Sequence, residues 1–409
     1  GLGIFKEDFL HYLSGFHFSG DIYAIPEGTV IFPKEPLLKV IAPIMEAQLV
    51  ETAILNIINH QSLIATKTSR IVFAANGDGI MEFGLRRAQG PDAGLYGARA
   101  AMIGGCVGTS NVLAGQMFDV PVMGTHAHSW IMSFPDELTA FRAYAKLYPS
   151  ACILLADTYD TLGSGVPNAI RVFQEMRDAG IPLTFYGIRL DSGDIAYLSR
   201  KAREMLDEAG WETATITVSN SLDEYIIRDM WMQDAKIDSF GVGERLITAR
   251  SEPVFGGVYK LVAVEDKDGN VVPKIKISEN VGKITTPHFK KLYRFYGRDT
   301  GKAIADYLCV YDETVDDSDK MTIFDPEATW KRKEVYHFEA RELLVPIFKN
   351  GELVYKQPSL EEIRAYCAAQ VDTLWDEVKR FDNPHRYYVD LSQKLYDIKQ
   401  ELLTKNGSH

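Results

Sequence analysis

Two histidines stand two residues apart in the segment VPVMGTHAHSWIMSF, residues 120–134. An apolar run that is typical of a β-strand ends at Gly124, and His126 and His128 follow it. A histidine at a strand end can bind a metal, fill a hydrogen-bonded structural position or act as a nucleophile. The side chains that other segments bring to the same place decide between these chemistries.

Five further segments end a short apolar run with polar or glycine-rich residues. They are IMEFGLRRAQG, CILLADTYDTLGSG, TFYGIRLDSGD, TITVSNS and SFGVGER. Helical segments lie between them, and strands that alternate with helices predict a parallel sheet, open or closed into a barrel. Since the carboxyl ends of parallel strands meet at one edge, these segments are expected to form one site.

The residue types at these strand ends suit a sugar phosphate with magnesium. Guanidinium groups bind phosphate and carboxylate oxygens, glycine-rich turns offer backbone N–H groups, and carboxylates hold Mg²⁺, bind ribose hydroxyls or orient a histidine. The residues concerned are Arg86, Arg87, Arg189, Ser219, Asn220, Ser221, Gly241, Val242, Gly243, Asp157, Asp160, Asp191 and Asp194.

Each of these features also has a simpler interpretation. The arginines can form surface salt bridges, and Asp191 or Ser192 can simply cap the next helix. A His-x-His pair binds a metal in metal-dependent barrel hydrolases, but such a site needs more histidines on later strands. The strand ends between residues 150 and 245 contain none. We therefore predict no metal ligands here and keep a hydrolase using His126 and His128 as an alternative.

Composition narrows the class of protein. The 409 residues are 46% hydrophobic and 24% charged, as in ordinary soluble globular proteins. The net charge of −12 disfavours nucleic acid as a ligand, and the absence of a long apolar run predicts no membrane span. The four cysteines are widely separated, which favours a reducing cytoplasm. Because residue 1 is Gly rather than Met, we expect that preceding residues have been removed.

Several long motifs, in one order, resemble the nicotinate phosphoribosyltransferases, which are type II phosphoribosyltransferases. They are PEGTVIFPKEPLLKV, EAQLVETAILNIINHQSLIATK, EFGLRRAQGPDAGLYGARAAMIGGCVGTSNVLAG, GTHAHSW, LLADTYDTLGSG, RLDSGD and FGVGERLIT. The resemblance covers nearly the whole chain. It implies an α/β fold, an irregular TIM-like α/β barrel with a flanking β-rich domain and C-terminal helices.

The expected domains follow the same resemblance. Residues 1–65 would form the N-terminal part of the flanking domain with a long helix, and residues 66–250 the barrel with the active site. Residues 251–350 would be β-rich, and residues 351–409 would form the C-terminal helices.

The resemblance also implies an activity. Members of this family join nicotinate to 5-phosphoribosyl 1-diphosphate (PRPP), giving nicotinate mononucleotide and pyrophosphate on the Preiss–Handler route to NAD. The reaction uses Mg²⁺ and is coupled to ATP hydrolysis through a phosphorylated histidine. The family implies a cytoplasmic homodimer with its active site at the subunit interface, small-molecule substrates, and neither nucleic acid nor membrane as a partner.

The resemblance assigns catalytic roles by position. The family segment GT-x-AHS matches residues 124–129, which places the phosphate acceptor at His128 and puts His126 at a variable position. We therefore expect substitution of His126 to have a mild effect. Asp157 resembles the aspartate that orients the histidine, and Asp191 is the third expected catalytic group.

Substrate recognition is assigned in the same way. Arg86, Ser110 and Arg189 match positions that line the base pocket. The phosphate of the ribose is expected at Ser219, Asn220, Gly241 and Gly243.

Ser110 distinguishes between the possible ring substrates. The related nicotinamide enzyme has an aspartate at the position of Ser110, and an aspartate repels a carboxylate, so Ser110 favours nicotinate. A nicotinamide enzyme, another type II phosphoribosyltransferase and an inactive binding protein remain as alternatives.

One residue departs from the family pattern. Glu244 stands where the family often has threonine after GVG, and we expect it to turn away from a phosphate or to pair with Arg245.

Overall fold

The computed structural model describes residues 3–279 and 283–407, and the chain divides into two compact units. Unit 1 contains residues 1–56, 257–359 and 365–409. Unit 2 contains residues 57–256 and 360–364, and it carries every predicted site residue.

Unit 2 is built on six parallel strands in the order β4-β3-β8-β7-β6-β5. The strands are Gly79–Glu82 (β3), Gly108–Thr109 (β4), Ala151–Leu155 (β5), Phe185–Leu190 (β6), Thr215–Ser219 (β7) and Ser239–Val242 (β8). The sheet curls into half a barrel, which confirms the predicted barrel-like α/β fold. Its central strands are apolar and buried, as expected where helices cover a parallel sheet.

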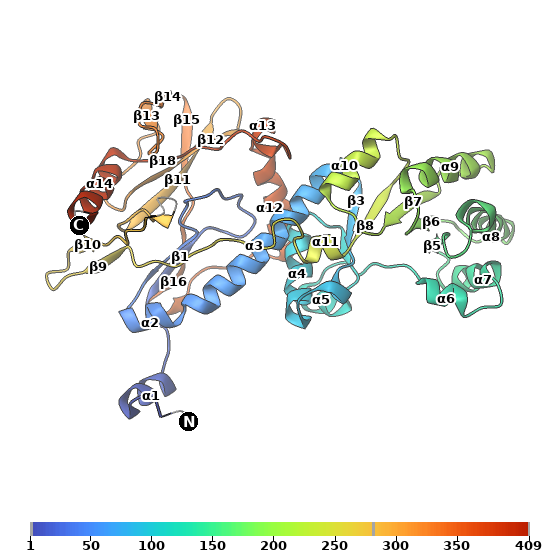
Figure 1. Cartoon of the computed structure of the whole chain (residues 1–409), viewed down its shortest axis with the longest axis horizontal. Coiled ribbons are helices and arrows are strands. Elements are labelled where there is room, and N and C mark those ends of the chain that lie inside the picture. The colour runs from blue at the N-terminus through green and yellow to red at the C-terminus, as the bar shows by residue number, and fades with distance from the viewer. Residues whose placement is uncertain (1–2, 280–282, 408–409) are drawn as a thin grey trace. The chain divides into compact units, whose positions relative to one another are not determined.

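Helices connect the strands of this sheet, and Figure 1 shows α8 and α9 beside β5, β6 and β7. The helical segments are Glu51–Ala74 (α3), Leu85–Arg87 (η1, a 3₁₀ turn), Pro91–Ile103 (α4), Val112–Phe118 (α5), His128–Met132 (α6), Glu137–Leu147 (α7), Thr161–Gly165 (η2, a π turn), Val166–Asp178 (α8), Ile195–Glu208 (α9), Glu224–Met232 (α10) and Glu244–Ile247 (α11).

Asp194, and neither Asp191 nor Ser192, caps the start of α9. The carboxylate of Asp194 accepts the Tyr197 N–H at 3.0 Å and caps the helix. Neither Asp191 nor Ser192 does so, which leaves both side chains for other contacts.

Unit 1 is rich in antiparallel strands. Its sheets have the orders β17-β16-β1-β2, β15-β11-β12-β18, β10-β9 and β13-β14, and among its described strands only β12 and β18 pair in parallel. The strands are Asp21–Ala24 (β1), Leu38–Ile41 (β2), Ala263–Glu265 (β9), Val271–Pro273 (β10), Lys290–Gly297 (β11), Ala303–Val310 (β12), Met321–Phe324 (β13), Arg332–Val335 (β14), Phe338–Glu342 (β15), Val345–Lys349 (β16), Glu352–Leu353 (β17) and Val389–Leu391 (β18).

Helices are also found outside the parallel-sheet region. They are Glu7–Ser14 (α1), Ile44–Leu49 (α2), Leu360–Asp372 (α12), Asp376–Lys379 (α13) and Gln393–Gly407 (α14). Within the described part of the chain, no helix combines the length and apolar character needed to cross a membrane.

Unit 1 contains a fully buried ion pair. The Arg294 guanidinium donates two hydrogen bonds to Asp306, at 2.8 and 2.6 Å, and both side chains are fully buried. The Tyr387 hydroxyl adds a third bond to Asp306 at 2.9 Å. Such a pair needs all its partners, because a buried charge that loses one is strongly destabilising.

Candidate active site

The six parallel strands of unit 2 place the predicted residues at the end of the sheet where the strands' carboxyl ends meet. All neighbouring pairs in the sheet run in the same direction, so their carboxyl ends lie together. Three groups of contacts describe this end of the sheet: one at the ends of β5, β6 and β7, one at the ends of β3 and β4, and one at the ends of β7 and β8.

Arg189 is the centre of the first group. Its guanidinium donates to the Ser219 hydroxyl at 2.9 Å, to the Thr125 hydroxyl at 2.8 Å and to an Asp191 oxygen at 2.9 Å. These bonds join the ends of β6 and β7 to the segment before α6, and the Arg189 side chain is only 17% exposed. The guanidinium is therefore held in one orientation.

Asp191 stays ionised within this network. Burial acts to raise the pKa of Asp191, but hydrogen bonds from the Ser219 hydroxyl and from Arg189 outweigh it and hold the pKa below its usual value. The carboxylate therefore contributes a negative charge at neutral pH.

His128 faces two carboxylates. Its Nε2 lies 3.6 Å from an Asp191 oxygen and 3.9 Å from an Asp157 oxygen, and its Nδ1 lies 3.1 Å from the Thr158 hydroxyl. The imidazole is 38% exposed, so a ligand can reach it. Both Asp157 and Asp191 are therefore near the histidine, and Asp191 is slightly the closer.

Asp157 is fixed by the loop after β6. One carboxylate oxygen accepts the Asp191 N–H at 2.8 Å and the Ser192 hydroxyl at 2.6 Å. The other oxygen, Oδ1, is buried and has no hydrogen-bond partner among the described residues. This oxygen faces Nε2 of His128 at 3.9 Å.

The second group lies where β3 and β4 end. The Ser110 N–H donates to the Glu82 carbonyl at 3.0 Å, and the Glu82 carboxylate accepts the Thr109 hydroxyl at 2.6 Å and the Gly84 N–H. Arg86 follows in η1 and is exposed. Glu82 therefore connects the loops that carry Arg86 and Ser110.

The third group is formed by backbone at the ends of β7 and β8. Asn220 has a φ of 89°, in the left-handed region that few non-glycine residues adopt. A Cβ on Gly241 would lie 2.5 Å from the Phe83 ring, and one on Gly243 would lie 2.9 Å from the Phe83 carbonyl. Glycine is thus required for the close approach of β8 to the end of β3.

Of the two alternatives expected for Glu244, the pairing with Arg245 is not found. Arg245 instead donates to Asp223 at 2.5 Å, and the exposed Glu244 lies 3.4 Å from Arg250. Consecutive residues of a helical turn point in different directions, so Arg245 does not face its neighbour. Glu244 does turn toward solvent.

Several contacts of the site were not anticipated from the sequence. Thr125 and Thr158 lie inside the motifs noted above, yet no role was assigned to them, and Ser192 was considered only as a helix cap. Glu82 was also overlooked, although an acidic residue at the end of an otherwise apolar strand is a visible signal. His126 is buried beside β5, and its Nε2 accepts the Leu155 N–H at 3.2 Å.

Metal binding by the histidine pair finds no support in the geometry. Among the described residues, no group of three or more His, Cys, Asp or Glu side chains is placed to hold a metal ion. The Nε2 of His126 is also occupied by a backbone N–H.

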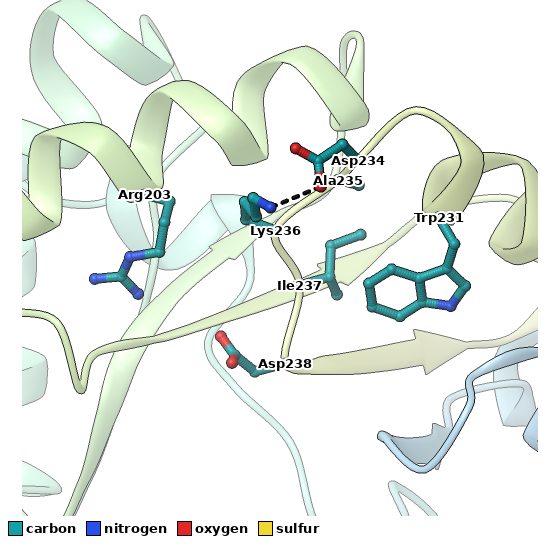
Figure 2. A pocket seen from close by; sticks show the side chains of 7 residues that line it. All are labelled: Arg203, Trp231, Asp234, Ala235, Lys236, Ile237 and Asp238. Carbon is teal, nitrogen blue, oxygen red and sulfur yellow. Dashed lines mark hydrogen bonds and ion pairs between the residues drawn. The ribbon is translucent and has the colours of Figure 1, made fainter.

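A cavity of about 330 Å³ lies away from these strand ends (Figure 2). It is lined by the residues that precede β8, by Arg203 of α9 and by Trp231 of α10. Its charged groups already have partners: Lys236 pairs with Asp234, and Arg203 pairs with Asp207 and two carbonyls. None of the predicted site residues lines this cavity.

Comparison with known proteins identifies the class to which this fold and site belong. Three family profiles match: the nicotinate phosphoribosyltransferase (NAPRTase) N-terminal domain at residues 1–59, the NAPRTase family at 79–301 and the C-terminal domain at 289–399. The chain belongs to the nicotinate phosphoribosyltransferase family.

Individual relatives agree with this family. The nicotinate phosphoribosyltransferase of Bacillus subtilis is 48% identical over 97% of this chain and 80% of its own length. The crystal structure of human nicotinic acid phosphoribosyltransferase superposes with a TM-score of 0.83 at 29% identity, covering 97% of this chain and 85% of that one. A nicotinate-nucleotide pyrophosphorylase from Pyrococcus furiosus has a TM-score of 0.69 at 26% identity, covering 87% and 82%.

Proposed function

We propose that this chain is an enzyme that joins nicotinate to PRPP, giving nicotinate mononucleotide and pyrophosphate for NAD synthesis. The observation that carries the proposal is the network of His128, Asp157, Asp191, Arg189 and Ser219 at one edge of the parallel sheet. This network belongs to a chain that is 48% identical to the nicotinate phosphoribosyltransferase of Bacillus subtilis.

His128 is proposed to accept the γ-phosphoryl group of ATP. The negative charges of Asp157 and Asp191 beside Nε2 favour a proton on that nitrogen, which leaves the lone pair on Nδ1. Attack by Nδ1 would form an N–P bond as the bond between the γ-phosphorus and ADP breaks. The two carboxylates would then stabilise the positive charge that develops on the ring.

The carboxylates also suit the Mg²⁺ that accompanies PRPP and ATP. Oxygen ligands are those that Mg²⁺ prefers, and Oδ1 of Asp157 is buried without a partner among the described residues. Together with Asp191 it can hold the ion, which would neutralise charge on the diphosphate. The side chains then have to orient the ribose and stabilise charge as the pyrophosphate leaves.

Nicotinate is proposed as the ring substrate in preference to nicotinamide. Ser110 is uncharged, and Glu82 holds its loop beside the loop of Arg86, so a guanidinium and a hydroxyl can meet a carboxylate. The ribose phosphate is assigned to Asn220, Gly241 and Gly243, with Ser219, whose hydroxyl already contacts Asp191 and Arg189.

A homodimer is part of the proposal. Large apolar side chains are exposed near the site-bearing loops of unit 2, which favours burial against another subunit. They are Leu85 (42% exposed), Val112 (70%), Leu113 (51%), Met117 (52%) and Met132 (66%).

The test is turnover of nicotinate and PRPP with Mg²⁺, with and without ATP, by the purified chain and by its His128→Ala variant. The variant should lose ATP hydrolysis and retain some ATP-independent transfer. His385→Ala, an exposed histidine of unit 1, is the matched control and should behave as the wild type.

Three results would contradict the proposal. Unchanged ATP hydrolysis in His128→Ala would refute the role of that residue. Preferential use of nicotinamide would overturn the substrate assignment. Binding of nicotinate mononucleotide without any turnover would indicate a binding protein.

A further inference from the structure

The two outermost strands of the parallel sheet are connected by a single stretch of chain. β4 lies at one edge and β5 at the other. The stretch that follows α5 forms a single parallel β-bridge with β4: the Thr109 N–H donates to the Pro121 carbonyl at 3.0 Å, and the Met123 N–H donates to the Thr109 carbonyl at 2.9 Å. Residues 121–123 therefore lie beside β4.

The other end of this stretch reaches β5 through a side chain. In a strand, successive N–H groups point to opposite sides, and the Ala156 N–H is used toward β6, where it donates to the Arg189 carbonyl at 3.0 Å. The Leu155 N–H therefore points to the free edge. There it donates to Nε2 of His126 at 3.2 Å, in the place that the carbonyl of a neighbouring strand would occupy.

His126 is well suited to this contact. It is 7% exposed, and its ring meets the Tyr144 ring edge-on at a centroid distance of 4.6 Å. Burial lowers the pKa of His126 to about 4, so the imidazole is neutral near pH 7 and can accept an N–H. Because Nε2 is the acceptor, the proton of the neutral ring lies on Nδ1.

We infer that His126 is a positioning residue, whose imidazole joins the two edges of the half-barrel and thereby fixes the active-site segment 124–128. The residues on both sides of His126 belong to the site. Thr125 accepts a hydrogen bond from Arg189, and His128 faces Asp157 and Asp191. The role of His126 in turnover rests on the proposed function, whereas its bond to Leu155 does not.

This inference changes the expectation from the sequence, in which His126 occupies a variable position. Variability at a position is compatible with this role, because any side chain that places an acceptor at the Leu155 N–H would serve. The relevant property is the acceptor and not the imidazole itself.

Two substitutions of His126 distinguish the effect of its hydrogen-bond acceptor from the effect of its ring shape. His126→Phe keeps a ring against Tyr144 but has no acceptor; it also removes the Nδ1–H, which has no partner among the described residues. His126→Gln can place its amide oxygen close to the position of Nε2. Tyr144→Phe is the matched control, because it keeps both the ring contact and the bond to Leu155.

The first measurement is hydrogen exchange of the Leu155 amide by NMR. Exchange should be faster in His126→Phe by about tenfold or more, and near the wild-type rate in His126→Gln and Tyr144→Phe. The second measurement is turnover: kcat should fall about tenfold in His126→Phe and remain within about threefold of wild type in His126→Gln. The KM values should change less than kcat. His126→Asn, whose amide is too short to reach Leu155, should resemble the Phe variant and replaces it if that variant does not fold.

Wild-type exchange at Leu155 in His126→Phe would overturn the inference. Equal impairment of the Phe and Gln variants would overturn it too, because shape and not the acceptor would then be decisive. If the wild-type chain shows no transferase activity, the proposed function fails, but the exchange comparison still tests the contact between His126 and Leu155.

Discussion

Replacing Glu82 by glutamine should weaken nicotinate binding without direct contact between Glu82 and the substrate. Glu82 ends β3 and is fully buried, and its carboxylate accepts the Gly84 N–H and the Thr109 hydroxyl. It therefore ties the loop of Arg86 to the loop of Ser110. In the proposed function these two loops recognise the pyridine carboxylate.

The magnitude follows from the hydrogen bonds that glutamine can replace. Its amide oxygen can accept the Gly84 N–H, but its NH₂ group then faces the Thr109 hydroxyl, whose oxygen already accepts the Asn111 N–H at 3.0 Å. The Thr109 hydroxyl proton loses its acceptor, which costs ~1.5–3 kcal/mol for a bond to a charged group. Burial raises the pKa of Glu82, so removing the buried charge offsets part of this cost. A net loss of about 1–2 kcal/mol remains, or a factor of ~5–30 in an equilibrium constant.

The assay is steady-state kinetics of Glu82→Gln with nicotinate and PRPP varied separately. KM for nicotinate should rise about 5- to 30-fold, while KM for PRPP should stay within about twofold, because the β3 and β4 loops are assigned to the ring. Thr109→Ser keeps the hydroxyl and is the matched control. An equal rise in both KM values, or the same loss in Thr109→Ser, would refute a role specific to the ring pocket.

Two other substitutions test unit 1 and the choice of substrate. Burial, with a smaller contribution from Asp325, raises the pKa of Asp390 from 3.8 to about 6. A raised carboxyl pKa contributes stability that is present below the unfolded value and is lost as pH rises through about 6. Asp390→Asn should therefore remove about 2 kcal/mol of variation in unfolding free energy between pH 4 and 7, measured with urea; an unchanged pH slope would contradict this. Ser110→Asp should weaken nicotinate binding about tenfold or more and favour nicotinamide in calorimetry, and an unaltered preference would count against the assignment of Ser110.

The sequence predicted part of the first contact group, because parallel strands bring their carboxyl ends together. Asp157, Arg189, Asp191 and Ser219 lie at or just after the ends of three neighbouring strands, so any parallel arrangement of β5, β6 and β7 would bring them together. The apolar runs also indicated buried strands between helices. Pattern and topology rules therefore carried this part of the prediction.

The remaining details depend on side-chain directions and on burial, which a single sequence does not specify. Thr125 and Thr158 are ordinary threonines until the fold places one against Arg189 and the other against His128. The burial of Glu82 depends on the pairing of β3 with both β4 and β8, and that strand order was not predicted. The same limit explains why the sequence left open whether Glu244 turns away or pairs with Arg245.

The contacts of the first group form a closed path that begins and ends in the segment 124–128. Thr125 binds Arg189, Arg189 binds Asp191, and Asp191 faces His128, which is three residues after Thr125. A displacement of this segment would therefore break the Arg189 contact and the His128 contact together. Losses from substitutions along this path should not add, because the first change already removes what the second would disturb. His126, in the middle of the segment, is thus coupled to the carboxylates without a direct hydrogen bond to either. Its effect on the site is transmitted by the backbone that it holds.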